Sequence, residues 1–179
     1  RIVEVVVAHA IAHPTVGFRC TIDGRSTLHL PKVETIEDRL YDVLGGQSSS
    51  LLPLQQPEDD ASVPGDETWS GYISTPDISR GKGDEIHILV NGRPVASTPF
   101  HQAIRRGYRT RLMQGRHPVT VLHLEVPANE VDVNVHPTKR EVRLRHSWRV
   151  LERLERAIAH TLASSPTQPD PSGELQGLE

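Results

Sequence analysis

The segment VDVNVHPTKREVRL, residues 131–144, constrains the fold more than any other part of the chain. Valines alternate with polar residues up to Val135, which is the period of two expected for a strand with one buried face. Pro137 interrupts this strand, because proline has no backbone N–H and holds the preceding residue in an extended conformation. The alternation resumes over residues 141–144. We therefore predict two strands joined by a corner that exposes Lys139.

The same segment resembles the signature of the MutL family of DNA mismatch repair proteins, in which a strand ending in D-V-N-V-H-P leads to a lysine and a short basic run. A second motif of that family, I-L-V-N-G-R-P-V, occurs at residues 88–95 and precedes a basic segment. The similarity covers roughly residues 1–163. The resemblance implies that the chain is the transducer domain of a bacterial MutL-like ATPase of the GHKL class.

Lys139 is the main candidate for a role in the ATPase cycle. In the family, the matching lysine contacts the γ-phosphate of ATP bound in the neighbouring N-terminal domain, and the resemblance implies this role for Lys139. An ammonium group on a four-carbon chain can bridge a gap between domains and stabilise charge on a phosphoryl group. Asn134, His136 and Pro137 are interpreted as scaffolding that positions the lysine. A solvated turn lysine is the alternative, and the flanking motif favours the phosphate contact.

The nucleotide pocket itself is not encoded in these residues. An N-x-x-D-A helix, a D-x-G-x-G loop and a glycine-rich lid, which a GHKL site requires, do not occur in the sequence. We therefore expect this chain alone to bind neither ATP nor Mg²⁺, and the full-length protein to be a weak ATPase that uses both. The ten histidines are scattered, so no metal site is predicted. Cys20 is the only cysteine, which fits a reducing cytoplasm.

A run of arginines is the second functional candidate. Residues 99–118 contain five arginines and no acid. A helix here would place Arg105 and Arg109 on one stripe. The unneutralised charge predicts a surface for phosphate backbones, with sequence-independent binding that salt weakens. A merely solvated arginine face is the alternative. The candidate DNA contacts are Arg93, Arg105, Arg106, Arg109 and Arg111.

Residue patterns predict most of the remaining elements. Residues 1–13 are compatible with strand or helix, and the resemblance favours a helix. A hairpin is expected around Asp23-Gly24, and Thr98 is expected to cap a helix with Pro99 in its first position. Further strands are predicted at residues 69–74, 85–90, 119–126, 131–135 and 141–145, and further helices at 35–44 and 147–163. This order predicts an α+β domain with a mixed sheet and helices packed on one face.

The resemblance supplies the detailed fold and the domain organisation. It implies the fold of the second domain of ribosomal small-subunit protein five. Residues 1–13 are expected to form the connecting helix from a missing ATPase domain, and residues 14–163 the transducer domain. Residues 45–68 are expected to be a flexible insertion, because their proline-spaced acids bury little apolar surface. Residues 164–179 are expected to be the disordered start of an interdomain linker. The chain opens at Arg1 without an initiator methionine and is expected to be a piece of a longer protein.

The resemblance implies that this domain couples the ATP state of an adjoining domain to other activities of the protein. ATP binding and hydrolysis in the adjoining GHKL domain would control dimerisation, DNA binding and recruitment of a MutS-type mismatch-recognition protein and downstream repair factors. A homodimer of the full-length protein is expected, in the bacterial cytoplasm with the nucleoid and without membrane contact. Three alternatives remain at this point. They are the transducer of another GHKL ATPase, a nucleic-acid-binding module with no ATPase link, and a protein-interaction domain.

Overall fold

A central sheet of five strands organises the domain. The structure, a computed structural model, describes residues 2–56, 67–132 and 142–165. The strand order is β3-β4-β9-β6-β7. Strands β6 and β9 are parallel and all other neighbours are antiparallel, which confirms a mixed sheet. The strands are β3 (Leu51–Pro53), β4 (Thr68–Ser74), β6 (Ile86–Val90), β7 (Arg93–Val95) and β9 (Thr120–Glu125).

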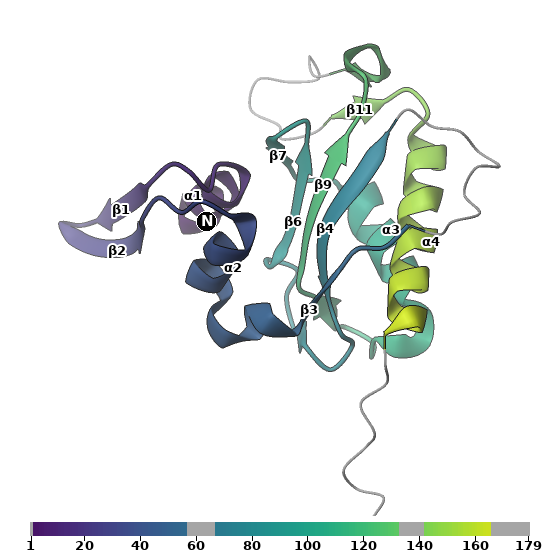
Figure 1. Ribbon diagram of the computed structural model, residues 1–179, viewed down its shortest axis with the longest axis horizontal. Helices are drawn as coiled ribbons and strands as arrows, with labels where there is room; N and C mark the ends of the chain where they lie inside the picture. Colours follow the sequence, from purple (N-terminus) through teal and green to yellow (C-terminus); the bar gives the residue numbers. More distant parts are fainter. Residues whose placement is uncertain (1, 57–66, 133–141, 166–179) are drawn as a thin grey trace, which may run out of the picture.

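Helices cover both faces of this sheet (Figure 1). Helices α3 (Thr98–Tyr108) and α4 (Ser147–Ser164) pack on one face, where Leu122 and Leu124 of β9 enter the larger core. Helices α1 (Ile2–Ala12) and α2 (Ile36–Leu44) pack on the other face, where Val121 enters a second core. The side chains of β9 alternate between the two cores, as the period of a strand requires. The α+β class is confirmed, but the prediction of helices on one face accounts for only one of these two layers.

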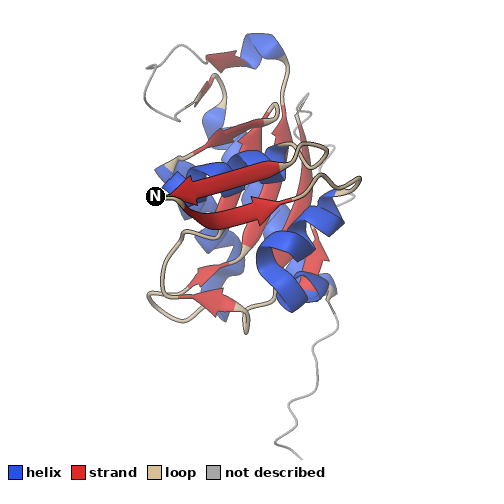
Figure 2. Ribbon diagram, turned by 90° about the vertical axis from the view of Figure 1, so that its left-hand side faces the viewer, coloured by secondary structure: helices blue, strands red, loops and turns tan. Residues whose placement is uncertain are grey.

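The predicted hairpin around Asp23-Gly24 is confirmed. Strands β1 (Phe18–Ile22) and β2 (Arg25–Leu30) pair antiparallel. Asp23 and Gly24 both have positive φ, 50° and 75°, which is the geometry of a two-residue type I′ turn. Figure 2 shows the hairpin beside the N-terminus, in front of the sheet and its helices.

A buried arginine attaches the loop that precedes the hairpin to α2. Arg39 is 0% exposed, and its Nη2 donates to the carbonyl oxygens of Pro14 and Val16 at 2.8 and 2.9 Å. Asp42 lies 3.5 Å from Nη1 of the same side chain. The helix begins as predicted, because the Thr35 side chain accepts a hydrogen bond from the backbone N–H of Asp38. No local residue pattern indicates that Arg39 is buried.

The prediction of a flexible insertion is wrong over residues 45–56. A 3₁₀-helix covers Gly45–Ser50, and β3 follows it as an edge strand of the central sheet. Leu51 enters the core beside α2, and the backbone N–H of Gln55 donates to Thr161 Oγ1 of α4 at 2.9 Å. Three leucines within four positions supply the apolar surface that the overall composition of the segment concealed. Residues 57–66 and 166–179, where the rest of the insertion and most of the linker were predicted, lie outside the described residues.

Two short strand pairs mark the two ends of the sheet. Strands β5 (Ser79–Arg80) and β8 (His117–Pro118) pair just before β9 begins. Strands β10 (Val131–Asp132) and β11 (Arg143–Leu144) pair shortly after β9 ends. These two ends, called the β5–β8 end and the β10–β11 end below, carry the functional candidates.

Helix α3 starts one residue earlier than expected. Its N-cap is Ser97, with no hydrogen bond from the capping side chain, so Thr98 is the first helical residue and Pro99 the second. Its buried face carries Phe100, Ala103, Ile104 and Tyr108. Gly107 is buried as well, against α4.

Candidate functional site

The β10–β11 pair holds together the two ends of the segment that contains Lys139. Val131 pairs with Leu144 and Asp132 with Arg143. Val131, Val142 and Leu144 pack against the core of α3 and α4, which confirms that this alternating pattern faces inward. The segment 133–141 therefore leaves and rejoins the fold at adjacent positions. Residues of this segment lie outside the described part of the chain, so the assigned roles stay predictions for Lys139, Asn134, His136 and Pro137.

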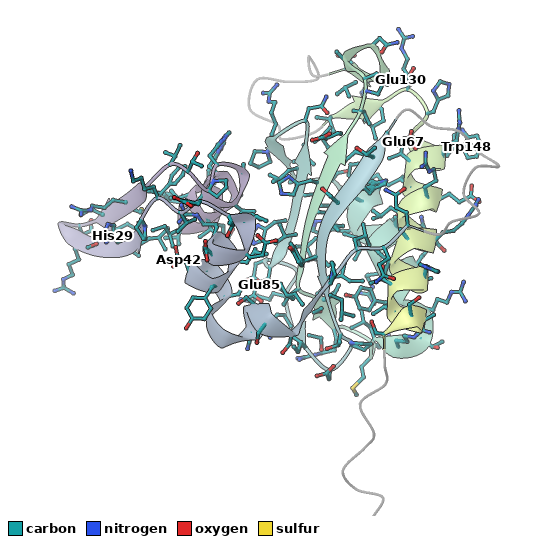
Figure 3. The ribbon with its side chains drawn as sticks, in the orientation of Figure 1. His29, Asp42, Glu67, Glu85, Glu130 and Trp148 are labelled. Atoms are coloured by element: carbon teal, nitrogen blue, oxygen red, sulfur yellow. The ribbon has the colours of Figure 1, made fainter. Side chains whose placement is uncertain are left out.

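A short 3₁₀-helix, Ala128–Glu130, braces this strand pair against α4. The backbone N–H of Arg145 donates to the carbonyl oxygen of Glu130 at 3.0 Å. The Glu130 carboxylate lies 2.9 Å from His146 Nδ1, at the N-cap of α4 (Figure 3). The strands that flank the Lys139 segment are thus fastened to the first turn of the longest helix of the described residues.

The predicted arginine stripe is broken by the end of α3. Arg109 has a φ of 53°, so the helix ends at Tyr108 and a 3₁₀ turn, Arg109–Arg111, follows. The Tyr108 hydroxyl donates to the Ser74 carbonyl oxygen at 2.6 Å and fixes this end of the helix. Arg105 and Arg109 therefore do not share one helical stripe, and that prediction is wrong. Arg105, Arg109 and Arg111 are nevertheless all exposed.

Arg106 has an acidic partner that the local sequence does not show. Its Nε lies 2.8 Å from Glu155 Oε2 of α4, 49 residues further along the chain. Both side chains are partly exposed, so the pair stabilises the α3–α4 contact only modestly, by about 0.5 kcal/mol. The prediction that no acid neutralises these arginines is wrong for Arg106.

Arg93 lies at the opposite end of the sheet from the other arginines. The turn that precedes Arg93 is held against Leu124 of β9, because the Leu124 carbonyl oxygen accepts a hydrogen bond from the Asn91 N–H at 2.9 Å. The end of α3 is bonded to Ser74, and Ser74 is in turn bonded to Val119. The Ser74 N–H donates a hydrogen bond to the Val119 carbonyl oxygen at 2.9 Å. The two anchors, Val119 and Leu124, are five positions apart in extended chain, which corresponds to about 17 Å. Arg93 therefore belongs to the β10–β11 end of the sheet.

Additional cations join the exposed arginines at the β5–β8 end. Arg116 bonds through its Nε to Ser79 Oγ at 3.0 Å, and Lys82 is exposed in the loop after β5. Gly83, next to Lys82, lies against the ring of His117 in β8. The S-R-G-K-G-D sequence is the feature from which an exposed loop carrying Lys82 could have been predicted. We call this the α3-end surface, and it consists of Lys82, Arg105, Arg109, Arg111 and Arg116.

His101 adds little positive charge near this surface at neutral pH. Burial, and secondarily the nearby His117, lower the pKa of His101 in α3 from its ordinary value. A lowered pKa keeps the imidazole neutral at pH 7. The positive character of the α3-end surface therefore comes from arginine and lysine, whose charge persists across the physiological range.

Two further properties of the described residues bear on function. Within residues 2–56, 67–132 and 142–165, no three or more His, Cys, Asp or Glu side chains are grouped so as to hold a metal ion. Over the same ranges, no helix has the length and apolar character needed to cross a membrane.

The mixed five-stranded sheet with helices on both faces defines an α+β domain, and solved structures share this fold. A crystal structure of the N-terminal domain of a DNA repair protein matches 90% of this chain and 52% of its own, with a TM-score of 0.70 and 22% identity. An Aquifex aeolicus MutL ATPase domain carrying a point mutation matches 88% of this chain and 50% of its own, with a TM-score of 0.56 and 16% identity.

Sequence comparison gives the family. The chain belongs to the family described as DNA mismatch repair protein, C-terminal domain, whose profile matches residues 42–163. The DNA mismatch repair protein MutL of Pelobacter propionicus is 37% identical over 168 residues, covering 93% of this chain and 26% of the relative. MutL of Geobacter sulfurreducens is 36% identical over 166 residues, covering 92% and 26%. The chain thus spans about a quarter of the length of these relatives, and it is a MutL-like mismatch repair domain.

Proposed function

We propose that this domain couples the ATP state of an adjoining GHKL domain to dimerisation, to sequence-independent DNA binding and to recruitment of repair partners. The observation that carries the proposal is the β10–β11 pair, which presents the ends of the Lys139 segment side by side at one end of the sheet. A lysine held between two such strands can contact a phosphate on a neighbouring domain and release it after hydrolysis. Family membership over residues 42–163 supports this assignment.

ATP and Mg²⁺ would be held by the adjoining domain. The described residues contain no cluster of carboxylates suited to a metal ion, and the GHKL nucleotide motifs do not occur in the sequence. Bound ATP would supply the phosphoryl group whose charge Lys139 stabilises. The contribution of this chain is then a positioned cation, together with the sheet and α4 that support it.

The partners proposed for the full-length protein are DNA, a MutS-type mismatch-recognition protein, downstream repair factors and a second copy of the same protein. Its place would be the bacterial cytoplasm, associated with the nucleoid. The relatives that support this proposal are bacterial MutL proteins. A nucleic-acid-binding module with no ATPase link is the competing function, and the exposed arginines alone would fit it equally well.

Substituting Lys139 separates these two functions. In the full-length protein, Lys139→Ala is expected to lower steady-state ATP hydrolysis at least tenfold, or about 1.4 kcal/mol of transition-state stabilisation. The control is Lys32→Ala, which removes the same charge from an exposed loop before α2. Circular dichroism of both variants checks folding. If Lys139→Ala hydrolyses ATP at the wild-type rate, the ATPase link is refuted and the binding module remains.

DNA binding is proposed for the α3-end surface. The triple variant R105A/R109A/R111A is expected to bind a labelled duplex about tenfold more weakly in low salt, and equally so for unrelated sequences. Its salt dependence, the slope of log K against log[salt], should fall by about 0.9 for each phosphate that the variant no longer neutralises. The control variant R19A/R25A/K32A removes three exposed charges from the β1–β2 hairpin and the loop after it. An equal reduction of affinity in both variants would show that net charge alone determines binding.

A further inference from the structure

A hollow opens on the face of the central sheet that carries the second core, beside the first residue of α2. We call it the sheet-face hollow. Its volume is about 390 Å³, within the range of ligand pockets, which is roughly 300 to 1,000 Å³. The lining residues come from α2 and from β3, β4 and β9, and they include Ile36, Pro53, Leu54, Tyr72, Val121 and His123.

The strand register brings the lining side chains together in adjacent rows. Tyr72 pairs with Val121, and Ser70 pairs with His123 in the next row of the same face. Val121 is fully buried in the second core, and Ile36 and Tyr72 pack against that core while remaining partly exposed. The hollow is therefore the open end of the second core, where α1 and α2 leave apolar surface uncovered.

One imidazole nitrogen of the hollow has no hydrogen-bond partner. His123 lines the hollow, and its Nε2 is buried without a partner among the described residues. Burial lowers the pKa of His123, partly offset by the negative charge of Glu125, so the ring is neutral at pH 7. A buried polar atom without a partner is costly. An occupant that hydrogen-bonds to this nitrogen would relieve that cost.

Carboxylates flank a hollow that is itself uncharged. The described lining residues carry no formal charge at neutral pH. Glu37 accepts a hydrogen bond from the Tyr72 hydroxyl on one side. Glu125 follows His123 by two residues on the same face of β9, on the other side. No ion pair joins either carboxylate to a described lysine or arginine, so the rim favours a cationic occupant.

The separation of the two carboxylates suits an extended peptide. Tyr72, which is bonded to Glu37, lies opposite Val121, and Glu125 lies four residues further along β9, or about 14 Å away. In an extended peptide, residues i−2, i and i+2 project from one face, and the outer two are also about 14 Å apart. A peptide with an apolar residue between two basic residues at alternate positions therefore matches the hollow and its rim.

We infer that the sheet-face hollow is a docking site for a partner protein that presents such an extended basic–apolar–basic segment. The apolar side chain enters the hollow between Tyr72 and His123, and the flanking lysine or arginine side chains pair with Glu37 and Glu125. The inference goes beyond the proposed coupling, because docking here requires neither ATP nor DNA. The α3-end surface, which is positively charged, would repel the same segment.

Three labelled peptides test the apolar and the charged parts of the hollow separately. Fluorescein-labelled Lys-Ser-Leu-Ser-Lys is titrated with the full-length protein, and fluorescence anisotropy reports binding. Lys-Ser-Ser-Ser-Lys lacks the apolar side chain and is expected to bind at least tenfold more weakly. Glu-Ser-Leu-Ser-Glu reverses the charge and is expected not to bind, because like charges then face each other across the rim.

Filling the hollow tests whether the peptide binds there. Ser70 is exposed and lines the hollow from β4, so Ser70→Phe is expected to weaken binding of Lys-Ser-Leu-Ser-Lys at least tenfold. The control is Ser26→Phe, the same substitution at an exposed serine of β2, and it should bind as wild type does.

Removing the two carboxylates tests the charge pairing. The variant E37Q/E125Q is expected to weaken binding of Lys-Ser-Leu-Ser-Lys about fivefold, as expected for two exposed ion pairs. Glutamine keeps an acceptor oxygen for the Tyr72 hydroxyl. The control D77N/D84N removes two exposed carboxylates from the loops on either side of β5 and should bind as wild type does.

Four outcomes would overturn the inference. Equal binding of Lys-Ser-Leu-Ser-Lys and Lys-Ser-Ser-Ser-Lys would show that charge alone determines binding. Wild-type affinity in Ser70→Phe would place the peptide elsewhere, equal binding of the acidic peptide would exclude a basic partner, and no binding by Lys-Ser-Leu-Ser-Lys would leave the hollow without this occupant. Circular dichroism verifies that Ser70→Phe folds, and if it does not, the comparison of the three peptides on wild-type protein decides.

Discussion

Replacing Gly71 with alanine is expected to destabilise the domain by about 4 kcal/mol, which is a large fraction of the stability of a typical domain. Gly71 lies in the middle of β4, opposite Leu122 of β9. Its φ is +124°, a backbone conformation that L-residues rarely adopt. A Cβ atom there would lie 2.0 Å from the carbonyl oxygen of Val121. The added methyl group therefore meets backbone that cannot rotate away.

Two other glycines separate the contributions of strain and steric overlap. Gly24 also has a positive φ, +75°, but a Cβ there meets nothing within 4 Å, so Gly24→Ala should cost about 1 kcal/mol from strain alone. Gly46 has neither constraint, and Gly46→Ala should change stability by about 0.5 kcal/mol or less. Urea unfolding of the three variants measures the order directly. A Gly71→Ala variant as stable as Gly24→Ala would mean that β4 and β9 separate easily at this point.

Acidification from pH 7.5 to pH 5 is expected to remove about 2 kcal/mol of stability through His87 alone. His87 lies in β6 and is 8% exposed. Burial lowers its pKa from the ordinary value of 6.5 to about 4, partly offset by the negative charge of Asp84. The neutral imidazole is therefore the form that the folded domain accommodates.

The direction of the effect follows from proton binding. Between pH 6.5 and pH 4, the unfolded chain protonates His87 and the folded chain does not, so lower pH favours unfolding. The contribution is fully present above pH 6.5, declines below it, and is lost near pH 4. His101 and His123 act in the same direction, since burial lowers the pKa of each.

The substitution His87→Gln isolates this contribution. The free energy of unfolding at pH 7.5 minus that at pH 5 should be smaller by about 2 kcal/mol in the variant than in the wild type. Urea unfolding at the two pH values measures both differences. His29→Gln is the control, because it makes the same substitution at an exposed histidine in β2. If the free energy of unfolding has the same pH dependence in wild type and His87→Gln, folding does not lower the pKa of His87.

The elements predicted correctly are those with local signals. The Asp23-Gly24 turn and the helices predicted at 35–44 and 147–163 each follow from residues a few positions apart. Strand β3 was missed because three residues within a polar stretch carry little periodicity. The layer formed by α1 and α2 was also missed, because it depends on which face of the sheet each helix meets.

The arginine candidates show why a charge pattern alone is insufficient. The partner of Arg106 is Glu155, and only the crossing of α3 and α4 brings the two together. The end of α3 at Arg109 depends on a backbone turn with positive φ, which composition does not specify. Arg93 is close in sequence to the other arginines, but β7 and α3 carry the chain from one end of the sheet to the other.

The buried Gly107 gives the domain a mechanical property. A Cβ at this position would lie 2.7 Å from Cβ of Ile158. The backbone of α3 therefore packs directly against a side chain of α4 where the two helices cross. Helix α4 has 18 residues and a length of about 27 Å. It starts beside the β10–β11 pair and leads to the part of the chain that follows Ser164. Helices in such close contact cannot slide past each other, so a displacement of the β10–β11 pair moves α4 together with α3 as one rigid unit, with their internal packing unaltered.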